Sequence, residues 1–119
     1  MLPKPQIATL YWLHLESHND AFLDGYIGVT TRSIDVRFKE HCSRFNNSYN
    51  LYNPLHQAFS KYGIENILKT RLCVCDIKEA YELERVFRPF EYTGWNTVQG
   101  GKVSPIALEI IRRKRNALL

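Results

Sequence analysis

Two stretches rich in β-forming residues lie close together near the start of the chain, and they constrain the fold more than any other feature. Residues 7–17 read IATLYWLHLES and residues 21–31 read AFLDGYIGVTT, and both are dense in aliphatic, aromatic and β-branched side chains. The polar sequence SHND, which is typical of a turn, lies at their junction. An antiparallel hairpin is the simplest pairing of two such strands. We therefore expect a β-sheet that starts with this hairpin.

The hydrophobic period changes from that of a strand to that of a helix directly after the second stretch. Ser33 is a suitable N-cap for a helix. Ile34, Phe38 and Cys42 then follow one helical turn apart, which places them on one face. This pattern predicts an amphipathic helix.

Four further elements are predicted along the rest of the chain. Residues 54–63 begin with a proline and end with a glycine, as a helix often does. Residues 66–76 alternate as a third strand, and residues 77–88 carry the strongest helical pattern, which Pro89 ends. A glycine-rich loop follows, and residues 105–119 predict a last helix.

The order of these elements predicts the fold class. Strand, strand, helix, helix, strand, helix, loop and helix indicate a small α+β domain, in which helices flank a three-stranded, mainly antiparallel sheet. A length of 119 residues fits one such domain, and a hydrophobic content of 45% is enough for a core.

The charge of the chain favours a polyanionic partner. Lys and Arg number 16 against 12 Asp and Glu, and four cations are consecutive in RRKR at residues 112–115. A solvated tail at the end of a helix would account for this cluster equally well. No run approaches the roughly 18 apolar residues of a membrane span, and the first residues lack the features of a signal peptide. We expect no membrane partner and an intracellular location, either cytoplasmic or, for a phage protein, the host cytoplasm.

Three cysteines, Cys42, Cys73 and Cys75, leave two interpretations open. Reduced thiols in the core are one, and a zinc site that combines Cys73 and Cys75 with a histidine is the other. Their spacing does not match that of a zinc knuckle or ribbon.

Five short motifs occur in a fixed order along the chain. They are LYW at residues 10–12, YIG at 26–28, RFKEH at 37–41, YELERVFRP at 81–89 and GWNTVQGG at 94–101. Each motif alone is weak, but together and in this order they resemble the GIY-YIG nuclease family, from about Thr9 to Gly101. One departure is that Thr9-Leu10-Tyr11 stands where the family usually has Gly-Ile-Tyr. The tyrosine is kept, so the motif retains its functional group.

The resemblance implies an endonuclease that cuts phosphodiester bonds in DNA with one divalent ion, Mg²⁺ or Mn²⁺. It assigns these residues to the catalytic site: Tyr11, Tyr26, Arg37, His41, Glu84 and Asn96. Glu84 is the implied metal ligand, and a hard carboxylate suits Mg²⁺, which keeps most of its waters. Arg37 suits a phosphate, because its planar guanidinium donates two parallel hydrogen bonds.

The tyrosines and the histidine are the harder assignments. The resemblance makes Tyr11 the general base, which requires a nearby cation or metal-bound water to lower the pKa of a phenol from about 10. Tyr26 would orient the phosphate or the water. His41, one turn after Arg37, could relay a proton or hold an oxygen, so the base could also be His41. Asn96 is expected to be structural first, because it lies in a glycine-bounded turn.

The domain and partner predictions follow from the same resemblance. Residues 1–103 would form the nuclease domain, and residues 104–119 a basic helix. The candidate DNA-binding residues are Arg44, Arg112, Arg113, Lys114 and Arg115. Specificity would come from a homodimer or a separate partner. The competing hypothesis is a catalytically inactive nucleic-acid-binding module of the same fold, for which the altered first motif is the only support.

Overall fold

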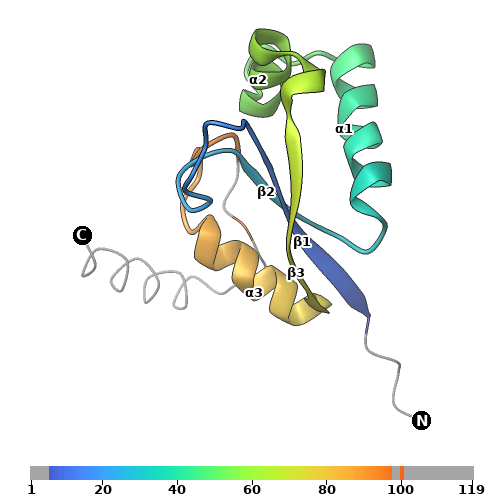
Figure 1. Ribbon diagram of the computed structural model, residues 1–119, viewed down its shortest axis with the longest axis vertical. Helices are drawn as coiled ribbons and strands as arrows, with labels where there is room; N and C mark the ends of the chain where they lie inside the picture. Colours follow the sequence, from blue (N-terminus) through green and yellow to red (C-terminus); the bar gives the residue numbers. More distant parts are fainter. Residues whose placement is uncertain (1–5, 98–99, 101–119) are drawn as a thin grey trace.

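A three-stranded antiparallel sheet forms the centre of the computed structural model, which describes residues 6–97 and 100 (Figure 1). The strands are β1 (Ile7–His14), β2 (Tyr26–Thr30) and β3 (Leu68–Asp76). β1 lies in the middle and pairs with β2 on one side and β3 on the other. The sheet is therefore antiparallel throughout, and β2 is an edge strand.

The hairpin of β1 and β2 confirms the first expectation from the sequence. Its register pairs Tyr11 with Gly28 and Leu13 with Tyr26. Because alternate residues of a strand share a face, Tyr11, Leu13 and Tyr26 all project from the same side of the sheet.

Both strands of the hairpin are shorter than the sequence suggested. Residues 15–17 and 21–25 were expected to be strand, but they form turns. The amide of Asp24 donates to the carbonyl of Asp20 at 2.8 Å, and Gly25 has a φ of 72°, in the region that favours glycine. Local turn formation therefore ends the pairing.

Within the described residues, three α-helices and one short 3₁₀ helix accompany the sheet: α1 (Ile34–Asn47), α2 (Pro54–Tyr62), η1 (Ile64–Asn66) and α3 (Ile77–Phe87). The predicted cap is confirmed, because Ser33 Oγ accepts from the amide of Val36 at 3.2 Å. Pro54 begins α2 and Gly63 follows its end, as the sequence indicated.

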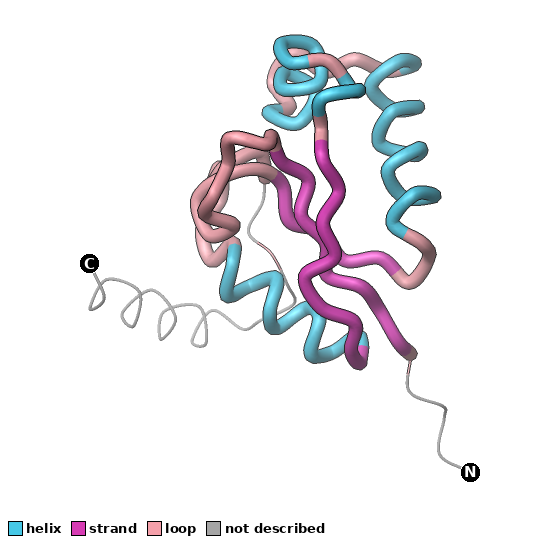
Figure 2. Tube along the Cα trace, in the orientation of Figure 1, coloured by secondary structure: helices cyan, strands magenta, loops and turns pink. Residues whose placement is uncertain are grey.

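The helices cover both faces of the sheet (Figure 2). Tyr11 and Leu13 of β1 pack with Leu55 and Phe59 of α2 in one core, which side chains of α1 also cover. Leu10 and Trp12 of β1 alternate with them, so they face the opposite side and pack with side chains of α3. This layered arrangement confirms the predicted α+β class.

The predicted basic helix at residues 104–119 lies outside the described residues. Within residues 6–97, no helix combines the length and apolar character that crossing a membrane requires.

Candidate active site

Two tyrosines from neighbouring strands lie next to each other in the candidate site. The rings of Tyr11 on β1 and Tyr26 on β2 have centroids 6.2 Å apart. Tyr11 is buried, and its ring lies over Gly28, the residue opposite it in the hairpin. A Cβ atom at position 28 would come within 2.4 Å of the Tyr11 hydroxyl oxygen. The glycine of the YIG motif thus provides the space that Tyr11 occupies.

His41 of α1 closes the site against these tyrosines. Its Nε2 atom lies 2.9 Å from the Tyr11 hydroxyl, and its ring meets that of Tyr26 edge-on at a centroid distance of 5.1 Å. Burial, together with the charges of Arg37 and Arg44, lowers the pKa of His41 to about 4. His41 is therefore neutral near pH 7. In the tautomer with its proton on Nδ1, Tyr11 donates the hydrogen bond to Nε2.

The pKa values of both tyrosines differ from the expectation for a simple general base. Burial raises the pKa of Tyr11 well above its usual value, and the nearby Tyr26 raises it further. Arg37 lowers it, as the sequence analysis required of a cation, but does not offset the burial. The pKa of Tyr26 is also raised, chiefly by burial. Neither phenol ionises by itself at neutral pH.

Arg37 lies one helical turn before His41 and is half-buried. Its Nη1 atom donates to Glu40 Oε2 at 2.9 Å, and the other oxygen of Glu40 pairs with Arg32 Nη2. Burial alone would lower the pKa of Arg37, but the neighbouring Tyr11 and Glu40 groups raise it, so the guanidinium keeps its charge. Glu40, which the sequence analysis did not single out, thus holds Arg37 beside the tyrosines and also pairs with the exposed Arg32.

Glu84 reaches the same region from α3, on the opposite face of the sheet. Its side chain is half-buried, and its charge contributes to the raised pKa of Tyr26, so the two groups are neighbours. The backbone of Gly100 lies against it, because a Cβ atom there would be 2.6 Å from Glu84 Cγ. Among the described residues, no group of three or more metal-ligating side chains occurs. The carboxylate of Glu84 is a hard oxygen ligand of the kind that Mg²⁺ and Mn²⁺ bind.

Asn96 binds the backbone of β2. Its Oδ1 atom accepts from the amide of Ile27 at 3.0 Å, and its Nδ2 atom donates to the carbonyl of Ile27 at 2.9 Å. The same Oδ1 accepts from Arg88 Nε at 2.9 Å. Asn96 therefore fixes the strand residue next to Tyr26, which fits the expectation of a structural role.

Arg88 is the polar residue near the site that the sequence analysis missed. It is fully buried directly after α3, and its guanidinium donates to backbone carbonyls of the turn before β2 at 2.7 to 3.0 Å: those of Ala21, Phe22, Asp24 and Gly25. The signal was a charged residue between an apolar helix end and Pro89. Arg88 and Asn96 together fix the chain that leads into Tyr26, and we name this pair the Arg88 hub.

Of the candidate DNA-binding residues, only Arg44 lies in the described part of the chain. It is exposed in the last turn of α1, and its charge lowers the pKa of His41 and that of Tyr26, so it adjoins the site. The other four, Arg112, Arg113, Lys114 and Arg115, lie outside the described residues.

The cysteines are free, half-buried thiols. Cys73 packs against the core beneath α3, and Cys75 is half-buried. Burial and the neighbouring Cys73 raise the pKa of Cys75 to about 11, so its thiol stays protonated. Neither belongs to a metal-ligating group within the described residues.

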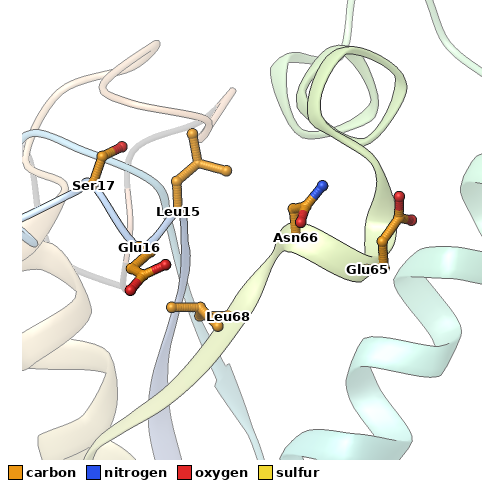
Figure 3. Close-up of a pocket in the computed structure, with 6 residues that line it drawn as sticks. All are labelled: Leu15, Glu16, Ser17, Glu65, Asn66 and Leu68. Carbon is orange, nitrogen blue, oxygen red and sulfur yellow. The ribbon is translucent and has the colours of Figure 1, made fainter.

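A separate surface pocket of about 560 Å³ lies between the hairpin turn and η1 (Figure 3). Its lining is Leu15, Glu16, Ser17, Glu65, Asn66 and Leu68. None of these is a candidate catalytic residue, and two carboxylates suit a phosphate poorly. We therefore assign the site to the tyrosine cluster instead.

Comparisons of the chain with protein-family models, with curated proteins and with solved structures give no significant match. The geometry of the site is therefore what indicates a function. Tyr11, Tyr26, Arg37 and His41 come from three different elements and meet in one cluster.

Proposed function

We propose that this protein is a metal-dependent DNA endonuclease that hydrolyses phosphodiester bonds, as the GIY-YIG nucleases that its motifs resemble do. The observation that supports this most is the hydrogen bond between Tyr11 and His41, with Arg37 and Tyr26 beside it. This hydrogen bond joins two residues that are 30 positions apart in the sequence. Phosphodiester hydrolysis needs a route for a proton and a cation for the phosphate, and this cluster offers both.

Arg37 would bind the phosphate. Its charge is stable, and it lies next to Tyr11, where the attacking water must come. The paired N–H groups of a guanidinium match two phosphate oxygens and stabilise the charge that grows on them in the transition state.

Tyr11 and His41 would remove the proton of the attacking water together. The Tyr11 oxygen accepts a proton from the water as its own proton passes to His41 Nε2, so no phenolate forms. The oxygen of the water bonds to phosphorus, and the bond to the leaving oxygen breaks. A bound phosphate is negative and would raise the pKa of His41 from about 4, which makes it a better acceptor.

Glu84 would hold the divalent ion. When bound, such an ion stabilises negative charge on the phosphate and on the leaving oxygen. The charges of Arg37 and Glu84 both act on Tyr26, which would orient a phosphate oxygen.

Half of the altered first motif lies away from the tyrosine cluster. Leu10, which stands where the family has isoleucine, is buried in the core beneath α3, on the face of the sheet opposite to Tyr11. Thr9, which stands where the family has glycine, is half-buried and alternates onto the face of Tyr11, so Thr9→Gly is the substitution that tests whether the motif change affects cleavage.

A plasmid-nicking assay tests the proposal. We expect the full chain to nick supercoiled plasmid in Mg²⁺ or Mn²⁺ and to give no nicking in EDTA. Glu84→Ala should lower the rate roughly a hundredfold or more, as loss of a transition-state charge interaction does.

The matched control is Glu82→Ala, which removes an exposed carboxylate from the same helix. It should nick at the wild-type rate. Binding of DNA without cleavage in either metal would contradict the proposal and favour the inactive module.

A further inference from the structure

The connection between α1 and α2 exposes an unusual amount of apolar and aromatic surface. Tyr49 is 49% exposed, Leu51 60% and Tyr52 83%. Apolar patches on a soluble protein often mark a binding surface. We refer to these three residues as the loop platform.

The backbone that carries the loop platform is held by side-chain hydrogen bonds. The amide of Asn50 donates to His56 Nδ1 at 3.0 Å, and that of Tyr52 donates to Asn50 Oδ1 at 2.9 Å. Gln57 Nε2 donates to the carbonyl of Leu51. A surface of fixed shape loses less conformational entropy when a ligand binds it.

The aromatic rings also link the platform to the active site. Tyr49 packs edge-on against Phe45, with ring centroids 5.5 Å apart, and Phe45 lies one turn after His41 on α1. At ~1.5 Å per residue, the end of α1 at Asn47 is about 9 Å beyond His41 along the helix axis. This is on the order of three nucleotides of a stacked strand.

The charges around the platform favour a nucleic acid over an acidic or neutral partner. From His41 to Ile64 the sequence contains no Asp or Glu. Arg44 lies between the platform and the catalytic cluster, and its charge affects both His41 and Tyr26. A cation and exposed aromatic rings are the features with which proteins bind single strands. The carboxylate nearest to the platform in the sequence is Glu40, whose charge interacts with Arg44.

We propose that the loop platform stacks unpaired bases of the DNA a few nucleotides from the phosphate at Arg37. The faces of bases within a duplex are covered by their neighbours, so only unpaired bases can stack on Tyr52. The substrate class is therefore DNA with a single-stranded segment, such as a flap, bulge or branch. This inference rests on the proposed nuclease function.

Binding in EDTA tests the platform without cleavage. The probe is a 12-nucleotide oligo-dT with one 2-aminopurine, compared with a blunt duplex of equal length. We expect the wild-type chain to prefer the single strand and to quench the 2-aminopurine fluorescence. Tyr52→Ala should weaken single-strand binding about tenfold and abolish the quenching, since stacking contributes ~1–3 kcal/mol per base. Tyr52→Phe should retain both.

Tyr92→Ala is the control, because Tyr92 is exposed to 72% in another loop. It should bind as the wild type does. The inference would be overturned if Tyr52→Ala bound the single strand and quenched 2-aminopurine as strongly as the wild type does. It would also be overturned if the wild type were a dimer that Tyr52→Ala dissociates without any change in DNA binding. If the wild-type chain nicks plasmid but Tyr52→Ala binds single strands normally, only the platform inference is refuted. If Tyr52→Ala weakens single-strand binding but the wild-type chain never nicks plasmid, only the nuclease proposal is refuted.

Discussion

Arg37 in the candidate active site and Arg88 in the hub are residues of the same type in opposite surroundings. Arg37 is half-buried on α1, is paired with Glu40 and lies beside Tyr11. Arg88 is fully buried and binds the oxygens of Asn96 and of backbone carbonyls around Gly25. An arginine that binds substrate must stay accessible, whereas one that fixes loops uses its donors within the protein. The first should matter for activity and the second for stability.

The largest effect should come from Arg88→Met. The substitution would leave buried carbonyls and Asn96 Oδ1 without their donor, and each unsatisfied group is costly. We expect the free energy of unfolding to fall by about 4 kcal/mol, measured by urea denaturation. The control is Arg71→Met, at an exposed position of β3, which should change it little. Equal stability of the two variants would contradict the role of the hub.

The next effect should come from Arg37→Ala, measured by single-turnover cleavage. We expect the rate to fall about a hundredfold, because the transition state loses a charge interaction, while the urea midpoint changes little. Lys39→Ala removes an exposed cation from the same helix and should cleave normally. If Arg37→Ala unfolds as readily as Arg88→Met, the contrast between the two arginines is wrong.

The smallest effect should be a dependence of stability on pH that arises from His41 in the candidate active site. Because folding lowers the pKa of His41 from 6.5 to about 4, the folded state binds fewer protons than the unfolded state between these values. The contribution of the neutral His41 to the free energy of unfolding is thus complete above about pH 6.5 and is lost as the pH falls towards 4. Urea midpoints at pH 7 and 4.5 should show a loss of about 2 kcal/mol from this group. His41→Asn cannot titrate, so its profile should be flatter by that amount; parallel profiles would contradict the shift.

The elements of the fold were predictable because their signals are local. The cap at Ser33, the proline of α2 and the alternation of β3 each depend on residues near in sequence. The ends of the hairpin strands were not predictable in this way. Phe22 and Leu23 are β-formers, yet both are exposed in a turn. The carbonyl of Phe22 accepts a hydrogen bond from Arg88, which is 66 positions away in the sequence.

The candidate site was predictable in its members but not in its electrostatics. The motifs selected Tyr11 and His41, whereas their hydrogen bond and shifted pKa values arise from tertiary burial. His14 shows the same limit. It is buried and stacks on Trp12, and its Nε2 atom lies 2.7 Å from Thr70 Oγ1. That contact depends on the register of β3, which no local pattern specifies.

The close fit of Tyr11 over Gly28 has a consequence for the order of folding. The two residues pair within one hairpin, so the loop that must close between them is short and its entropic cost is small. His41 is 30 positions from Tyr11 and can meet it only after α1 has docked. We therefore expect the hairpin to bring Tyr11 and Gly28 together earlier in folding than α1 brings His41 to the Tyr11 hydroxyl.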